Sequence, residues 1–276
     1  MVVLNILYAF ISIGILGGLF GVGLAVASRV LAVKKDERIG QVEALLPGAN
    51  CGACGFAGCA AYAEAIVTQD AELTRCPPGG PETAKKLGEF MGVAVEMTGE
   101  KMVAQVFCRG TRDTSATDFE YRGLEDCNAL YASFKGDKVC AFGCLGLGSC
   151  IKVCPSDAIF RHSSGYIYVD KDRCISCGKC LDVCPSGVMK WIPYAADTLV
   201  ACNSTDKGAL VRKYCTVGCI GCSICEKKSP EGGFVVENFL ASIDYNKNGS
   251  REEAAKACPP KCIIQLNVTE EERKKV

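Results

Sequence analysis

The sequence predicts an α+β protein in which one apolar helix is followed by several small cysteine-rich units. Three observations indicate this architecture: an apolar run at the N-terminus, a dense group of cysteines soon after it, and two later cysteine runs that end in Cys-Pro. The chain has 276 residues, 21 cysteines and a formal net charge of zero. This length permits one to three domains, and the charge balance argues against a nucleic-acid partner.

Residues 1–33 are nearly all apolar and are expected to form a single transmembrane anchor helix, because about 20 apolar residues span a bilayer. The alternative is a cleaved signal peptide ending at Ala25-Val-Ala27. The uncharged N-terminus and the length of the run disfavour it. Arg29, Lys34 and Lys35 follow the apolar run, which places the rest of the chain on the cytoplasmic side. That side also keeps thiols reduced.

Residues 34–100 are expected to form a small helical domain around one metal cluster. Its spacing is Cys-x2-Cys-x4-Cys-x16-Cys, and intervening glycines let the backbone wrap closely and direct N–H groups at sulfur. Helices are predicted from Cys59 and over 81–97. Four buried structural cysteines are the alternative. The predicted [4Fe–4S] ligands are Cys51, Cys54, Cys59 and Cys76.

Residues 136–200 contain the most informative run, Cys-x2-Cys-x2-Cys-x3-Cys-Pro at 174–185. This pattern is typical of bacterial ferredoxins with two [4Fe–4S] clusters, where three cysteines bind one cluster and the fourth binds the other. Zinc sites usually take paired Cys-x2-4-Cys units instead. A ferredoxin domain with two clusters is therefore expected here. One cluster is assigned to Cys154, Cys174, Cys177 and Cys180.

The upstream run of this domain carries Leu147 where its middle cysteine is expected. Our hypothesis is that Cys140, one helical turn before the next cysteine, supplies the missing ligand. The second cluster would then be held by Cys140, Cys144, Cys150 and Cys184. Alternating residues on both sides of a Ser-Ser-Gly turn predict a hairpin over 158–169 between the two runs.

Residues 201–276 read as a degenerate ferredoxin-like unit with one cluster. The four kept ligands all serve one cube, and they are Cys219, Cys222, Cys225 and Cys258. The positions of the other cube hold Ser229, Asn248, Arg251 and Ala254. We expect this half to be empty and to offer a surface to a partner.

Residues 101–135 are expected to be a linker with a strand over 102–107. A repeat relates Cys127-x12-Cys140-x3-Cys144 to Cys202-x12-Cys215-x3-Cys219. Five cysteines remain unassigned, and they would either bind a fifth cluster or be buried thiols that pack as small hydrophobes. These are Cys108, Cys127, Cys202, Cys215 and Cys262.

Taken together, the apolar helix, Cys-Gly-Ala-Cys-Gly-Phe-Ala-Gly-Cys at 51–59 and the runs at 140–185 resemble the B subunit of the Rnf electron-transport complexes. The resemblance covers essentially the whole chain. It implies a single-pass protein of the bacterial cell membrane that takes electrons from reduced ferredoxin. Its partners would be membrane subunits that pass the electrons to NAD while Na⁺ or H⁺ is pumped. Contact with lipid would involve one helix.

Four [4Fe–4S] clusters follow from these assignments, with a fifth left open. No nucleophile–base pair, Walker loop or Gly-x-Gly-x-x-Gly fingerprint after a strand is visible, so we expect neither NAD nor flavin on this chain. An electron-transfer subunit of another membrane oxidoreductase, such as a hydrogenase-like complex, and a zinc-binding interaction module are the alternatives. Scattered surface charge is the default interpretation of four cations near the second run, and attraction of an acidic ferredoxin is the functional alternative: Lys171, Arg173, Lys179 and Lys190.

Overall fold

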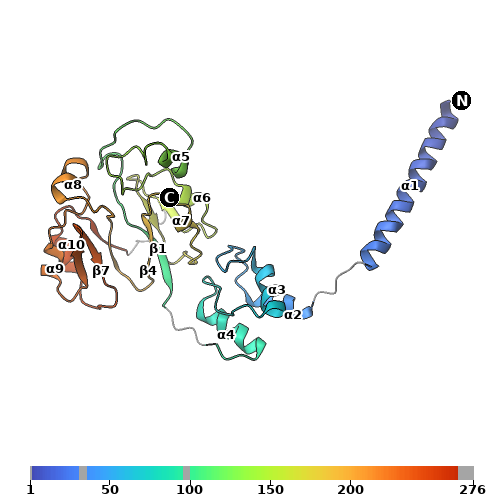
Figure 1. The fold of residues 1–276 in the computed structure, drawn as a ribbon, viewed down its shortest axis with the longest axis horizontal. Coiled ribbons are helices and arrows are strands. Elements are labelled where there is room, and N and C mark those ends of the chain that lie inside the picture. The colour runs from blue at the N-terminus through green and yellow to red at the C-terminus, as the bar shows by residue number, and fades with distance from the viewer. Residues whose placement is uncertain (1, 31–35, 96–99, 267–276) are drawn as a thin grey trace. The chain divides into compact units, whose positions relative to one another are not determined.

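A computed structural model describes residues 2–30, 36–95 and 100–266 (Figure 1). The chain divides into two compact units, Met1–Gln41 and Val42–Val276, and each is described by itself. Some predictions lie outside the described residues. They are the charges Lys34 and Lys35, the anchor's end at 33, the predicted helix end at Met97 and the last ten residues of the chain.

The N-terminal helix α1 spans Val2–Val30 and is apolar on all sides. Within it, Ile6–Val30 is a 25-residue stretch that is long and apolar enough to cross a membrane. Its length of about 37 Å exceeds the roughly 30 Å of a bilayer's hydrocarbon core. Large side chains such as Phe10 and Leu24 are more than two thirds exposed, as expected of a helix whose solvent is lipid.

Three helices follow α1, and the first of them crosses the boundary between the two units at Gln41 and Val42. Cys59 begins a helix, as predicted, but the expected helix over 81–97 stops at Met91. Gly92 adopts φ 72° there and its N–H bonds to the carbonyl of Gly88, which ends the helix with a left-handed glycine cap. The small domain buries Tyr62 and Leu87. The helices are α2 Glu37–Leu45, α3 Cys59–Gln69 and α4 Gly80–Met91.

The next part of the chain, the first of two repeats, contains two antiparallel strand pairs. Its first and last strands form the outer pair, and the two strands between them form a hairpin. The register places Met102 opposite Pro193 in the outer pair and Ile159 opposite Val169 in the hairpin. The hairpin was predicted. The strand predicted over 102–107 was assigned to a linker, but it pairs with another strand of this repeat. The strands are β1 Met102–Val106 with β4 Met189–Pro193, and β2 Ile159–Arg161 with β3 Ile167–Val169.

Short helices carry cysteines beside these strands. They are α5 Cys127–Ala132, α6 Ser149–Lys152 and α7 Lys179–Asp182. Gly148 and Gly178 precede α6 and α7 with nearly equal φ values of 81° and 79°, which only glycine adopts without strain. The equal geometry shows that the two cysteine runs fold as copies of one another.

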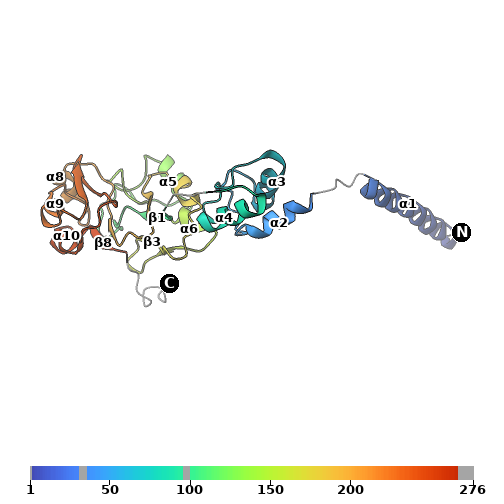
Figure 2. The same cartoon turned by 90° about the horizontal axis from the view of Figure 1, so that it is seen from below.

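The last part, coloured orange to red in Figure 2, repeats the same plan of strand pairs. An outer pair made by its first and last strands again accompanies a central hairpin. The outer pair is β5 Thr198–Val200 with β8 Ile263–Gln265, and the hairpin is β6 Phe234–Glu237 with β7 Leu240–Ile243. Its helices are α8 Gly208–Tyr214, α9 Ile224–Lys228 and α10 Glu252–Ala257. The shared topology supports an internal duplication within an α+β chain.

The half of this repeat that lost its cysteines is filled by polar side chains. Arg251 is 9 % exposed, and its Nε donates to the carbonyl of Gly232 at 2.8 Å. Its Nη2 donates to the carbonyl of Lys247. Ser229 Oγ accepts the N–H of Ala254 at 3.2 Å. Of the four replaced positions only Asn248 is exposed, so most of the expected partner surface is interior.

The two repeats are joined by backbone pairing around Cys215. Ser115 forms an isolated antiparallel bridge with Cys215, and the N–H of Ala116 donates to the carbonyl of Tyr214 at 2.7 Å. The N–H of Thr216 donates to the carbonyl of Thr114 at 2.9 Å. A segment of the first repeat is thereby held against the end of α8.

Candidate metal centres

The four cysteines predicted in the small domain lie around one cavity. Cys51, Cys54, Cys59 and Cys76 line it together with Tyr62. Asn50 Oδ1 accepts the N–H of Cys59 at 2.8 Å, fixing the start of α3 beside the thiols. Gly52 and Gly55 adopt positive φ between the first three cysteines. Burial raises the pKa of Cys76, and the Gly79 N–H bonds to its sulfur.

A second group surrounds the main ferredoxin-type run. Cys180 is buried, and its neighbouring thiols are those of Cys174, Cys177 and Cys154 together with Cys150 of the adjacent group. Burial raises the pKa of Cys180 to about 12. Cys154 Sγ accepts the N–H of Ala158 at 3.3 Å. The structure therefore brings together the four residues that the motif assigned to one cluster.

The third group differs in one member from the sequence hypothesis. Cys144, Cys150 and Cys184 share a cavity, and the fourth cysteine that lines it is Cys127. Cys140 lines a different cavity. Burial raises the pKa of Cys150 to about 12, and the nearby thiols of Cys127 and Cys184 add to the rise.

Cys127 reaches this cavity because the start of α5 is fixed to the neighbouring run. Its N–H donates to Ser149 Oγ at 2.7 Å, and Ser149 Oγ donates to Asp126 Oδ2 at 2.9 Å. Asp126 also caps α5, accepting the N–H groups of Asn128 and Ala129. The sequence signal was the repeat that pairs Cys127 with Cys202, since local spacing alone favours Cys140.

In the last repeat five thiols surround one cavity. The four predicted cysteines Cys219, Cys222, Cys225 and Cys258 line it, and so does Cys262. Cys262 Sγ lies 3.6 Å from Cys258 Sγ. The single S–H of Cys262 donates to Cys258 or to Cys219, and it lowers the pKa of the thiol that accepts it to about 6.

A further cavity is lined by Cys108, Cys140, Cys202 and Cys215. Three of these cysteines had no assignment from the sequence. Buried Lys138 and the phenol of Tyr214 line it too, beside the polar side chains of Ser115, Asn203 and Ser204.

Groups of four thiols around a cavity fit the chemistry of a cube with one thiolate on each iron. Within the described residues no three Cys, His, Asp or Glu side chains close around one point as a lone metal ion requires. Backbone N–H groups point at several of the sulfurs, as they do at cluster ligands. Burial favours the protonated thiols, and on cluster binding iron would take the place of each thiol proton.

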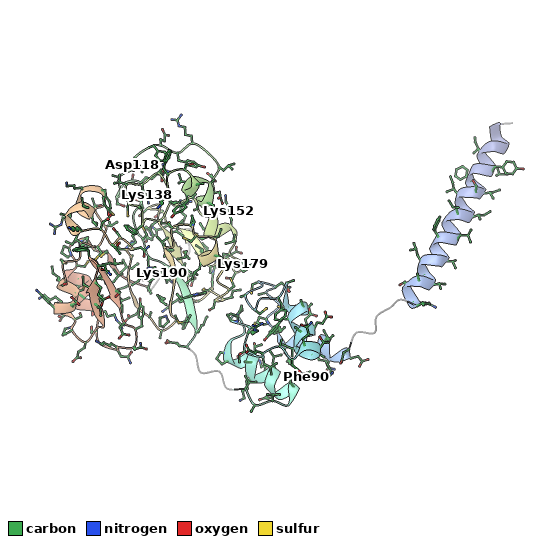
Figure 3. The ribbon with its side chains drawn as sticks, viewed as in Figure 1. Phe90, Asp118, Lys138, Lys152, Lys179 and Lys190 are labelled. Atoms are coloured by element: carbon green, nitrogen blue, oxygen red, sulfur yellow. The ribbon has the colours of Figure 1, made fainter. Side chains whose placement is uncertain are left out.

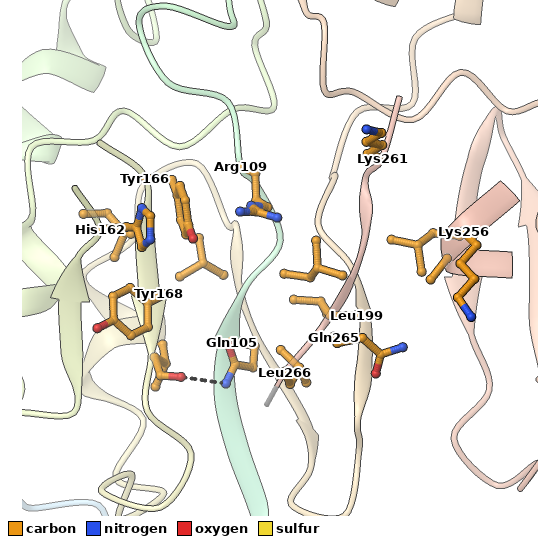
Figure 4. A pocket seen from close by; sticks show the side chains of 16 residues that line it. Gln105, Arg109, His162, Tyr166, Tyr168, Leu199, Lys256, Lys261, Gln265 and Leu266 are labelled. Carbon is orange, nitrogen blue, oxygen red and sulfur yellow. Dashed lines mark hydrogen bonds between the residues drawn. The ribbon is translucent and has the colours of Figure 1, made fainter. Parts of the chain in front are cut away.

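One cavity of about 440 Å³ is lined by no cysteine (Figure 4). Gln105 forms one wall and donates to the carbonyl of Val169 at 3.1 Å. Arg109 stacks over the ring of Tyr166 with 4.4 Å to its centroid. This cavity cannot hold an iron–sulfur cube, because it offers cations in place of thiols.

The repeated strand plan and its thiol-lined cavities define an iron–sulfur protein of the electron-transfer class. Residues 46–78 match a family model described as a putative Fe–S cluster domain, and residues 140–188 match a 4Fe–4S dicluster domain. The first match contains the thiols of the small domain, and the second contains both runs of the first repeat.

Full-length similarity identifies the family. The chain is 43 % identical over 255 residues to the B subunit of the ion-translocating oxidoreductase complex of Methanosarcina acetivorans, covering 91 % of this chain and 96 % of that protein. It is 42 % identical to the B subunit of the Na⁺-translocating ferredoxin:NAD⁺ oxidoreductase complex of Acetobacterium woodii, covering 91 % and 75 %. The proton-translocating counterpart of Clostridium ljungdahlii is 40 % identical, covering 90 % and 87 %. The chain belongs to the family of B subunits of the ion-translocating oxidoreductase (Rnf) complexes.

Proposed function

We propose that this chain accepts electrons from a reduced soluble ferredoxin and passes them to membrane subunits of its complex. The observation that carries the proposal is the set of four-thiol groups on two ferredoxin-like repeats and one small domain. A [4Fe–4S] cluster held by such a group supplies reversible one-electron transfer. The relatives' names supply the donor and acceptor, ferredoxin and NAD⁺.

The chain's own residues serve this role by holding and insulating the clusters. We assign one site to each of the groups of four thiols, and α1 to anchorage in the membrane. Arg29 at its C-terminal end favours placing the iron–sulfur part on the cytoplasmic side. The relatives are named for Na⁺ in one case and protons in another. Electron transfer is therefore the function we assign to this chain, independent of the ion.

The four cations near the second cysteine run differ in the contacts that their side chains make. Lys171 Nζ donates to the carbonyls of Tyr194 and Ala196. The charge of Arg173 lies 3.8 Å from Asp170. Burial lowers the pKa of Lys190, which lies over the ring of Phe107. Lys179 (Figure 3) lies on α7 inside the main cysteine run, and it is the cation we propose for steering an acidic ferredoxin.

Lys179→Glu should slow the oxidation of reduced ferredoxin several-fold at low ionic strength, because a favourable charge becomes repulsive. Lys179 is half-buried, but its interaction with a charge on ferredoxin crosses solvent. The difference from the unaltered chain should therefore shrink as salt is raised, since such interactions are screened over about 8 Å at 0.15 M. Stopped-flow absorbance under anaerobic conditions measures the rate. Lys85→Glu, an exposed lysine of the small domain, is the matched control.

Equal rates for Lys179→Glu and Lys85→Glu at every salt concentration would remove Lys179 from the docking surface. The broader function fails if dithionite-reduced ferredoxin is not oxidised at all by the anaerobically purified chain. A chain that contains zinc and no iron would also refute it.

A further inference from the structure

The cavity of Cys108, Cys140, Cys202 and Cys215 gathers residues from four distant segments. Cys108 follows β1, Cys140 lies in the loop before α6, Cys202 follows β5 and Cys215 ends α8. Convergence from such separated positions requires the whole fold. Because free thiols gain little from meeting one another, four of them around one cavity indicate a shared ligand.

The backbone around these thiols follows the pattern seen at a predicted cluster ligand. The N–H of Phe142 bonds to the sulfur of Cys140, that of Ser204 to Cys202 and that of Val217 to Cys215. Each donor lies two residues after its cysteine. The same relation holds in the main ferredoxin run, where the N–H of Lys179 bonds to Cys177. Such donors stabilise the negative charge of ligating sulfur.

We propose that Cys108, Cys140, Cys202 and Cys215 bind a fifth [4Fe–4S] cluster, and that Cys127 completes the site of Cys144, Cys150 and Cys184. The proposal rests on the electron-transfer function proposed above and extends it by one site.

The internal repeat explains why equivalent cysteines have different roles. Cys127 and Cys202 occupy equivalent positions. The first repeat has Leu147 in its run, and Cys127 fills the place this leaves. The second repeat has Cys222 at the position equivalent to Leu147, so its own site is complete without Cys202. Cys202 is then available to the fifth site.

The fifth site joins the two repeats. Cys140 lies four positions before Cys144 and Cys215 lies four positions before Cys219, so each Cα pair is at most about 14 Å apart. One side of the fifth site thus adjoins a site of the first repeat and the other side adjoins the site of the second. We assign it the role of relay between the repeats.

Lys138 gives this site a distinctive charge. It is 8 % exposed, lines the cavity and donates from Nζ to the carbonyl of Gly110 at 2.7 Å (Figure 3). A buried cation beside a cluster favours the more negative, reduced state, because attraction is strong at low dielectric. Lys138 should therefore raise the reduction potential of the fifth cluster relative to a site without it.

Iron and acid-labile sulfide per chain test the ligand set in the full-length protein purified without oxygen. Five sites predict about 20 irons, four for each cube. Cys108→Ala/Cys215→Ala should contain about 16. Adding Cys140→Ala and Cys202→Ala should remove no more iron, because all four residues serve one cluster. The visible and reduced-state spectra of the remaining clusters report whether each variant is folded.

An unaltered chain with about 16 irons would overturn the fifth cluster while leaving the electron-transfer function intact. A fourfold variant that loses clearly more iron than the double variant would return Cys140 to the site of Cys144. Zinc that disappears in the double variant would identify a zinc site, and the relay would be rejected.

A milder variant tests the site without removing a ligand. Lys138→Gln should move the reduction potential of the fifth cluster furthest to a more negative value in a redox titration followed by electron paramagnetic resonance. The potential of the neighbouring site should move less in the same direction, because Lys138 also acts on Cys144, and the remaining potentials should stay in place. Lys135→Gln, which alters an exposed lysine three residues earlier, should change none. Identical titrations for both variants would separate Lys138 from any cluster and contradict the proposed site.

Discussion

At the residue scale, Arg251 shows what fills a position where the repeated cysteine pattern has no cysteine. The guanidinium bonds to two backbone carbonyls and lies over the ring of Tyr245 at 5.5 Å. A cation now occupies a region where the other repeat holds an anionic site. The replacement stabilises the fold by hydrogen bonding, because the buried carbonyls would otherwise lack donors.

Arg251→Ala should destabilise the last repeat by about 3 kcal/mol, since charged hydrogen bonds to buried carbonyls are lost. Thermal unfolding of the anaerobic protein, followed by the loss of cluster absorbance, measures this. Lys256→Ala is the control, because its pair with Glu252 is exposed and screened by water. A melting temperature unchanged by Arg251→Ala would show that this network contributes little.

At the scale of elements, the contact between α5 and α6 determines which thiol completes a site. Ser149 is 3 % exposed and accepts the N–H of Cys127 while donating to Asp126. One hydroxyl therefore couples the cap of α5 to a helix that carries Cys150. The position of Cys127 depends on this coupling more than on its place in the sequence.

Ser149→Ala should leave the N–H of Cys127 without its partner, at a local cost of about 1–2 kcal/mol. One cluster, about four irons, should then be lost faster to an iron chelator than from the unaltered chain. Colorimetric detection of chelated iron over time gives the rate. Ser163→Ala, in the exposed hairpin turn, should not change it, and equal rates for the two variants would contradict the coupling.

The sequence alone predicted the elements and sites that depend on residues close to one another in the chain. Close spacing predicted that Cys51, Cys54 and Cys59 share a cavity, and alternation predicted the β2–β3 hairpin. The sequence did not predict the strand pair or the thiol-lined cavity whose residues are farthest apart in the chain. Nothing near 102–106 shows that β1 pairs with β4, and the same pairing helps to bring Cys108 to its cavity. The end of α4 was missed because the apolar spacing continues past Gly92, whose left-handed conformation ends the helix.

At the scale of the molecule, the apolar helix α1 and the thiol-bearing part lie in separate units. No cysteine lies within Met1–Gln41, and α2 extends into the second unit through buried Val42. The metal sites should therefore form without α1. The full predicted arrangement of five domains stays a prediction beyond this division.

Deletion of residues 1–35 should yield a chain that stays in solution without detergent and retains the iron content of the full-length protein. The reason is that α1 supplies exposed apolar surface and no ligand. Sedimentation in detergent-free buffer and iron analysis give the result. Aggregation, or loss of four or more irons per chain, would show that α1 supports the second unit.

The outer strand pair has a consequence for the order of biosynthesis. Met102 lies opposite Pro193, 91 residues later in the chain. At about 5–20 residues per second, β1 leaves the ribosome roughly 5–20 s before β4 is made. Cys108 and Cys127 emerge during this interval with their sites unfinished. Metal delivery to the site of Cys127 would therefore follow translation of Cys184, and delivery to the proposed site of Cys108 would follow translation of Cys215. Oxidants present before then would meet thiols that the finished protein encloses.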